Sequence, residues 1–217
     1  MADPAGNDPN LLLRYALGGD ESALAALFDG HRERLRRMIR LRLDRRLSGR
    51  VDASDVLQDT YLDVRRRFAE YARDPSAMPF HLWLRLVAGQ RLTDVHRHHL
   101  GSQMRDAGCE VSLHRGPFPQ ANSVSLAAQL LGKLTSASQA AIRVEHKLIV
   151  QEALNSMDPI DREVLALRHF ELLSNGEVAQ ILGLSKAAAS NRYVRALKRL
   201  KEILSAVPGL GARRPGT

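Results

Sequence analysis

Three polar side chains near the C-terminus have the types and the spacing needed to read DNA. No residue between 185 and 206 breaks a helix, and at about 100° per residue one face of that helix carries Asn191, Arg195 and Lys198. Arg grips guanine bidentately, Asn grips adenine in the same way, and Lys holds phosphates. The flanks of this face carry Ser190, Arg192, Val194 and Arg199. We interpret the face as a DNA-reading surface; the alternative is a basic helix face that is only solvated.

The signals around this helix predict a helix-turn-helix that positions the face. Ser174 and Glu177 form a capping box that starts a first helix, and Gly183 ends that helix in a left-handed conformation. Ser185 caps the second helix, so the link is short and the two helices must cross steeply. Ala179 faces the crossing, where a small side chain lets the helices approach. The inward side of the second helix is predicted to consist of Ala189, Tyr193, Ala196, Leu197, Leu200 and Ile203.

A second candidate surface is acidic. Asp52, Asp55, Asp59 and Asp63 fall within about 80° of one another on a helix, and no basic residue lies among them. The opposite side of that helix is apolar, with Leu57, Tyr61, Val64 and Phe68. Such a face is either solvated or a docking surface for a basic partner. Leu62 lies beside the carboxylates, and an exposed Leu there favours docking.

The helix that begins at Phe80 changes character along its length. It is apolar on more than one side over residues 82–87, and it becomes polar and basic over residues 90–99. The preceding stretch, 71–79, is predicted to be a loop because it contains two Pro and an Asp-Pro pair. Residues 31–50 add nine Arg, on a face that is either solvated or binds nucleic acid. We expect the apolar start of this helix to be buried in a folded domain and its basic end to lie at the surface, where it can bind nucleic acid.

The composition fits a protein with a polyanionic partner. The chain has 217 residues, 44% of them hydrophobic, and a formal net charge of +8 with a sequence pI of about 10.2. The single cysteine, Cys109, excludes an internal disulfide and fits a reducing compartment. The sequence has no apolar run of about 18 residues and no signal-peptide pattern at its start. We therefore expect a soluble, cytoplasmic protein without a membrane partner.

A long irregular stretch divides the chain. Residues 101–124 are rich in Gly, Pro, Ser and Asn and have no clear period, which is uncommon inside a compact domain. A short helix is expected over 126–134. Strand alternation is not apparent anywhere, so we predict an all-α fold of two small helical domains joined by a long linker. The predicted bounds are a helical bundle at 10–100, a linker at 101–136 and a helix-turn-helix domain at 137–207.

Three segments together resemble one family. They are DASDVLQDTYLDVRRRF at 52–68, PFHLWLRLVAGQRLTDVHRHH at 79–99, and ALNSMDPIDREVLALRHFELLSNGEVAQILGLSKAAASNRYVRALKRLK at 153–201. In order and spacing they resemble the extracytoplasmic-function (ECF) group of bacterial RNA polymerase sigma factors. The first two segments look like region 2 of that family and the third looks like region 4. Gly89-Gln90 and Ala187 to Ala189 depart from the Arg-Asn and Gly-Thr-Val that family members often have at these places.

The resemblance implies a function for each surface. Region 2 would bind core RNA polymerase through Asp55, Gln58, Asp59 and Leu62. It would also open the −10 promoter element and capture an unstacked non-template base through Tyr71, Arg73, Asp74, Ser76, Gln90, Arg91 and Arg97. Region 4 would read the −35 element in the major groove through Lys186, Ser190, Asn191, Arg192, Val194, Arg195, Lys198 and Arg199. An anti-sigma factor is a further implied partner.

Two other functions compete with this interpretation. His96, His98, His99, Cys109 and His114 are metal-ligand types in one neighbourhood, but their spacing matches no zinc motif. No Gly-rich phosphate loop or nucleophile motif is present, so we expect no metal, no cofactor and no enzyme activity. A stand-alone helix-turn-helix regulator is the other alternative. It would need neither the acidic helix nor the buried helix that begins at Phe80.

Overall fold

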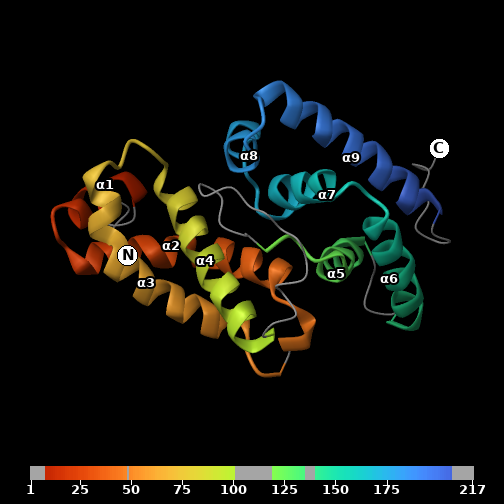
Figure 1. The fold of residues 1–217 in the computed structure, drawn as a ribbon, viewed down its shortest axis with the longest axis horizontal. Helices are drawn as coiled ribbons and strands as arrows, with labels where there is room; N and C mark the ends of the chain where they lie inside the picture. The colour runs from red at the N-terminus through yellow and green to blue at the C-terminus, as the bar shows by residue number, and fades with distance from the viewer. Residues whose placement is uncertain (1–7, 48, 101–118, 135–139, 207–217) are drawn as a thin grey trace, which may run out of the picture. The chain divides into compact units, whose positions relative to one another are not determined.

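Every regular element in the described part of the chain is a helix (Figure 1). The computed structural model describes residues 8–47, 49–100, 119–134 and 140–206. The predicted all-α fold is therefore confirmed. The chain divides into two compact units, residues 1–119 and 120–217, and each is described here by itself.

The first unit is a small helical bundle. Its elements are α1 (Pro9–Leu17), α2 (Glu21–Arg42), the short 3₁₀ helix η1 (Arg45–Leu47), α3 (Ala53–Arg73) and α4 (Phe80–Leu100). Helices α2, α3 and α4 pack against one another, and α1 packs on α2. The apolar sides of these helices form one core, in which Ile39, Leu57 and Leu84 are fully buried. This core fixes which side of α3 remains in solvent.

Short acidic side chains begin the helices of this unit. Asp20 caps α2 by accepting hydrogen bonds from the backbone N–H groups of Ser22 (2.8 Å) and Ala23 (3.1 Å). Asp52 caps α3, and the carboxylate of Asp55 accepts in return from the backbone N–H of Asp52 at 2.9 Å. These bonds satisfy donors that the first turn of a helix would leave unpaired. Two of the carboxylates of the acidic face therefore also begin the helix.

An aromatic cluster joins the end of α3 to the start of α4. The ring centroid of Tyr71 lies 5.0 Å from that of Trp83 and 5.4 Å from that of Phe80, and Phe68 packs beside them. Tyr71 is only 6% exposed, and its hydroxyl donates to the carbonyl of Pro75 at 3.4 Å. The prediction that Tyr71 contacts the −10 element is not supported, because its ring is a core side chain of the bundle.

His96 also differs from its predicted environment. The sequence places it in the basic end of α4, but the structure buries it, and its Nε2 accepts the backbone N–H of Asp44 at 3.2 Å. Burial lowers the pKa of His96, with an opposing contribution from the carboxylate of Asp44. Burial likewise lowers the pKa of His31, and the neighbouring His81 and Arg34 act in the same direction. Both imidazoles therefore favour the neutral form in the folded chain.

The second unit contains the helix-turn-helix. Its elements are α5 (Ser123–Leu134), α6 (Ala140–Asn155), α7 (Pro159–Leu165), the π-helical turn η4 (Ala166–Phe170), α8 (Asn175–Leu182) and α9 (Lys186–Ala206). The predicted capping box at Ser174 and Glu177 is present, and Gly183 closes α8 at φ 59°. Ser185 accepts a hydrogen bond from the backbone N–H of Ala188 at 3.1 Å, as expected of an N-cap. The predicted helix-turn-helix is thus confirmed with its own capping residues.

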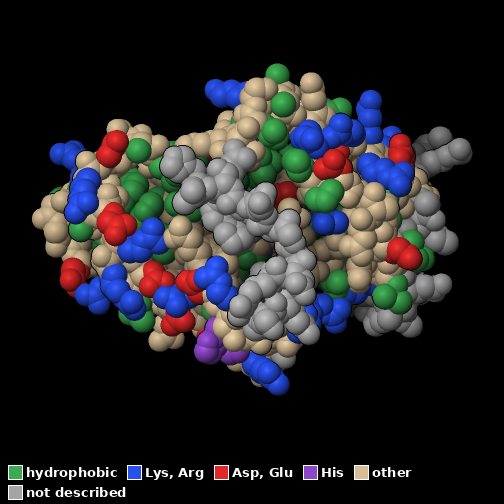
Figure 2. Space-filling model, in the orientation of Figure 1, with side chains coloured by type: hydrophobic (Ala, Val, Ile, Leu, Met, Phe, Trp, Pro, Cys, Tyr) green, Lys and Arg blue, Asp and Glu red, His purple; other side chains and the backbone are tan. Residues whose placement is uncertain are grey.

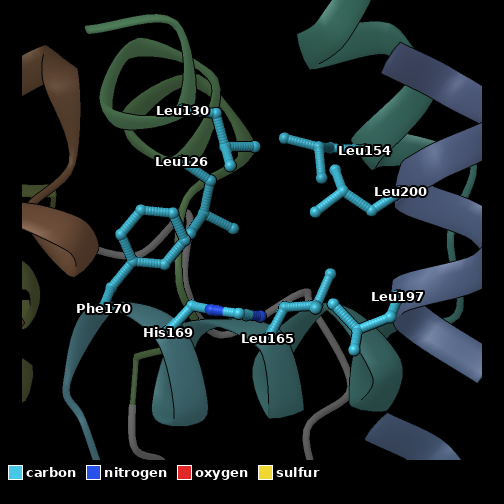
Figure 3. Close-up of a pocket in the computed structure, with 8 residues that line it drawn as sticks. All are labelled: Leu126, Leu130, Leu154, Leu165, His169, Phe170, Leu197 and Leu200. Carbon is cyan, nitrogen blue, oxygen red and sulfur yellow. The ribbon is translucent and has the colours of Figure 1, made fainter. Parts of the chain in front are cut away.

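Helix α5 lies inside the range for which the sequence predicts a linker. It packs on α6, and the buried carboxylate of Glu163 on α7 accepts the backbone N–H of Ala121 at 2.9 Å. The compact unit therefore starts before residue 137. An apolar cavity of about 200 Å³ lies between α5, α6, α7, η4 and α9, and Figure 3 shows the side chains that line it. Its lining residues are Leu126, Leu130, Leu154, Leu165, His169, Phe170, Leu197 and Leu200.

The low pKa of His96 predicts an acid-sensitive fold. In the unfolded chain a histidine titrates near pH 6.5, whereas the folded chain resists protonation until a lower pH. The contribution of each such histidine to the free energy of unfolding is therefore fully present above about pH 6.5. It should fall as the pH drops below that value, by at most about 1.4 kcal/mol per pH unit. Denaturant unfolding of the whole chain from about pH 7.5 to about pH 5.5 measures this slope.

The variant His96→Gln isolates the contribution of this side chain. Gln keeps an acceptor for the N–H of Asp44 but does not titrate, so the slope should become shallower. His98→Gln is the matched control, because His98 lies on the same helix with an exposed side chain. An equal slope in wild type and His96→Gln would contradict the assignment of His96 as a buried neutral histidine.

Candidate functional site

Helix α9 divides into a buried side and an exposed side. Ala189 and Ala196 are fully buried, and Leu200 and Ile203 continue the buried side toward the C-terminal end. The predicted inward residues Tyr193 and Leu197 are half-buried. Seven of the eight predicted DNA-contacting side chains are exposed: Lys186, Ser190, Asn191, Val194, Arg195, Lys198 and Arg199. Figure 2 shows basic side chains along α9 with acidic ones among them.

Arg192 is the exception among the predicted contacts. It is half-buried, and its Nη1 donates to Asp161 at 2.8 Å and to Asp158 at 3.4 Å, both at the start of α7. An arginine held in this way serves first to fasten α9 to α7. Arg192 therefore supports the surface that the exposed side chains around it form, and its own contact with DNA stays a prediction.

Asp161 connects this support to the exposed face. Its Oδ2 accepts Nε of Arg195 at 2.6 Å, and its Oδ1 accepts Nη2 of Arg195 at 2.8 Å. The hydrogen bond from Arg195 is the largest cause that lowers the pKa of Asp161, followed among the lowering causes by the bond from Arg192. Asp161 is buried, so the two guanidinium groups neutralise a carboxylate that water does not reach. The sequence did not predict the pairing of Asp161 with Arg195, because the two residues are 34 positions apart.

Further contacts hold the turn and the middle of α9. The side-chain amide of Asn175 on α8 donates to the carbonyl of Lys186 at 2.8 Å, which ties the start of α9 to α8. The hydroxyl of Tyr193 lies 3.1 Å from Nε2 of His169, and the guanidinium of Arg168 lies 5.0 Å from the centre of the Tyr193 ring. The exposed face is therefore fixed by contacts to α7, η4 and α8, and the orientation of the predicted DNA-reading residues follows from them.

The predicted docking residues share the exposed side of α3. Asp55, Gln58, Asp59 and Leu62 are spaced so that they lie on one helix face, and all of them are exposed, with Leu62 at 43%. Asp63 differs, because its Oδ2 accepts Nε of Arg91 on α4 at 2.7 Å. The exposed acidic surface is thus narrower than the sequence predicts, because Asp63 instead joins α3 to α4 through this bond.

Apart from the buried Tyr71, the predicted −10 residues fall into two places in the first unit. Arg73 is the last residue of α3, and Asp74 and Ser76 lie in the connection to α4, where Asp74 accepts the hydroxyl of Ser76 at 2.6 Å. This bond is the largest cause that lowers the pKa of Asp74. Gln90, Arg91 and Arg97 lie on α4, where each contacts another polar side chain. Gln90 accepts from Arg67, Arg91 pairs with Asp63, and Arg97 lies 3.6 Å from Asp94.

The proposed rival sites gain no support from the described residues. No group of three or more His, Cys, Asp or Glu side chains there is arranged to hold a metal ion. His96 is buried with a backbone partner, whereas Cys109 and His114 lie outside the described residues. Among the helices that the structure describes, none combines the length and the apolar character needed to cross a membrane.

Comparisons with known proteins agree on one family. Residues 147–200 match the family model described as sigma-70, region 4. The chain is 25% identical over 193 residues to the ECF RNA polymerase sigma factor BldN of Streptomyces coelicolor, which covers 89% of this chain and 64% of BldN. It is also 25% identical over 197 residues to the ECF RNA polymerase sigma factor SigK of Mycobacterium sp. strain KMS, which covers 91% of each protein. The chain thus spans less than two thirds of the length of BldN and most of the length of SigK.

Solved structures show a similar fold. The structure of CnrH in complex with the cytosolic domain of CnrY aligns with a TM-score of 0.55 at 23% identity, over 92% of this chain and 99% of that chain. The region 4 match covers the described helices from α7 to α8 and most of α9, and the relatives align over most of the chain. These matches support the ECF group of bacterial RNA polymerase sigma factors as the family of this chain.

Proposed function

We propose that the chain binds core RNA polymerase and directs it to promoters by recognising the −10 and −35 elements. The observation that carries this proposal is the division of α9, which is buried on one side and exposes seven predicted DNA-contacting side chains on the other. A helix that is fixed in this way and carries Asn, Arg and Lys outward suits the major groove. The residues assigned to this role lie in the predicted range 137–207.

The first unit supplies the second half of the proposal. The exposed face of α3 is proposed to bind a basic surface of the polymerase. This face consists of Asp55, Gln58, Asp59 and Leu62. The exposed residues Arg73, Asp74 and Ser76, together with Gln90, Arg91 and Arg97 on α4, are proposed to contact the −10 element. Arg73 and Arg97 supply exposed positive charge for the DNA backbone. The predicted range 10–100 contains all of these residues.

A stand-alone helix-turn-helix regulator is the weaker alternative. Such a protein would bind DNA through α9 but would have no use for an exposed leucine among carboxylates on α3. The sigma factors that align with both units also favour promoter targeting. We further propose that the protein acts in the cytoplasm, without enzyme activity or cofactor. An anti-sigma factor is a proposed partner, and CnrH, which has a similar fold, is solved with the cytosolic domain of CnrY.

Run-off transcription tests the proposed function. Core polymerase, the purified chain and a pool of genomic fragments should give defined transcripts whose start sites share two upstream elements. Sequence-specific DNA binding without any transcript above the level of core polymerase alone would instead support the stand-alone regulator.

Charge reversal on α3 tests the docking surface. Asp59→Arg, alone and combined with Gln58→Arg, should weaken binding to core polymerase on the order of tenfold at low salt, because like charges would meet across the interface. The loss should shrink as salt is raised. Both side chains are exposed, and neither caps the helix, whereas Asp55 does. Fluorescence titration of labelled chain with core polymerase measures the affinity.

Asp29→Arg is the matched control for this experiment. It makes the same change of charge at an exposed position on α2, outside the proposed docking face. It should leave polymerase binding close to that of wild type. Equal affinities for the α3 variants and the wild-type chain would remove the docking role from this face.

Arg195→Ala tests base reading by α9. It should cost about 1–3 kcal/mol of binding at one −35 base pair and little at the others. Lys198→Ala, an exposed neighbour on the same face, should weaken binding about equally for all sequences, because Lys contacts phosphate. Affinities for duplexes with each −35 base pair substituted in turn separate the two patterns. A uniform loss for Arg195→Ala would make Arg195 a phosphate contact.

A further inference from the structure

We propose that Asp161 is a positioning residue for base recognition. Its carboxylate holds the guanidinium of Arg195 from the side, so that the outer end of the guanidinium is presented to a guanine in the major groove. The proposal rests on the proposed function of α9 and adds a residue that would not touch DNA itself.

The contact between the two side chains is side-on. Nε of Arg195 donates to Oδ2 of Asp161 at 2.6 Å, and Nη2 donates to Oδ1 at 2.8 Å. A guanidinium carries five N–H donors in a fixed plane. Two are used by Asp161, which leaves both hydrogens of Nη1 and the outer hydrogen of Nη2. These remaining donors lie on the end of the group, and an end-on pair of N–H donors is what O6 and N7 of guanine accept.

Exposure of the two partners is strongly unequal. The side chain of Asp161 is 6% exposed and that of Arg195 is 60% exposed. The carboxylate therefore lies inside the protein surface, where it does not approach DNA phosphates, while the guanidinium extends beyond it. A negative charge placed beside DNA would otherwise weaken binding, but here it is covered and neutralised. The arrangement stabilises one orientation of Arg195 and still leaves its end accessible.

The carboxylate is itself held in place. Arg192, whose side chain is 26% exposed, also donates to Oδ1 of Asp161, at 2.8 Å. Asp161 lies in the first turn of α7, which Asp158 caps, and the following residues Val164 and Leu165 are buried. A carboxylate on a capped and packed helix is a fixed point of attachment. Because an arginine side chain has many rotamers, holding it in one orientation beforehand reduces the conformational entropy that is lost when it binds DNA.

Asp161→Asn and Asp161→Glu test this inference in the full-length chain. Asn removes the charge, and Glu keeps the charge but moves the carboxylate by one methylene group. Affinities are measured for −35 duplexes that carry each base pair at the position read by Arg195, and for a duplex with 7-deazaguanine there. In both variants the affinity preference for guanine at that position should fall about tenfold. The base preferences at other positions and the affinity for unrelated DNA should not change. In an Arg195→Ala background the same changes should have little further effect.

Asp158→Asn is the matched control. Asn retains N-cap function, and Asp158 contacts Arg192 without a hydrogen bond to Arg195, so the guanine preference should persist. Thermal unfolding identifies any variant that fails to fold, and Asp161→Glu keeps the test decisive if Asp161→Asn is such a variant.

Three results would overturn the inference: an unchanged guanine preference in Asp161→Glu, an equal loss at every base pair, or a stronger preference once Asp161 is changed. The last result would mean that Asp161 competes with DNA for Arg195. Failure of the proposed function looks different. In that case wild type would show no −35 base preference, and Arg195→Ala would bind the duplexes as wild type does.

Discussion

The second unit depends on burying one side of α9 without burying its positive charges. Ala189 and Ala196 are fully buried, and their small side chains let α9 approach the helices beneath it. The carboxylate of Asp161 is buried beneath α9, and a buried charge without a partner is costly. The half-buried Arg192 and the exposed Arg195 supply the partners, since both donate hydrogen bonds to Asp161. The outward presentation of α9 follows from this pairing together with the contacts at Asn175 and Tyr193.

In the first unit, packing of apolar side chains holds one face of α3 and leaves its polar face exposed. The rings of Phe68, Tyr71, Phe80 and Trp83 fasten the end of α3 to the start of α4. Burial of this side of α3 leaves the opposite side, with Gln58 and Asp59, in solvent. Both units thus follow one principle: a helix displays a polar face because its other face is held by specific contacts.

Much of this could be predicted from sequence because the signals are local. Capping residues such as Ser174 and Asp52 act within three or four positions, and Gly183 ends α8 by its own backbone conformation. Apolar periodicity likewise predicted the buried side of α9. The remainder is non-local. Asp161 and Arg195 are 34 positions apart, Asp44 and His96 are 52 apart, and neither pairing leaves a trace in local composition. The burial of Tyr71 could not be predicted either, because an aromatic residue beside a loop can equally stack on a base or complete a core.

Footprinting of one promoter tests the central proposal, that this chain directs core polymerase to promoters by recognising the −10 and −35 elements. The promoter is probed with the chain alone, with core polymerase alone and with both, and permanganate reports unpaired thymines. The account predicts protection of the −35 and −10 elements, with reactive −10 thymines, when both proteins are present. Full protection by the chain alone, with no −10 reactivity after core polymerase is added, would contradict it.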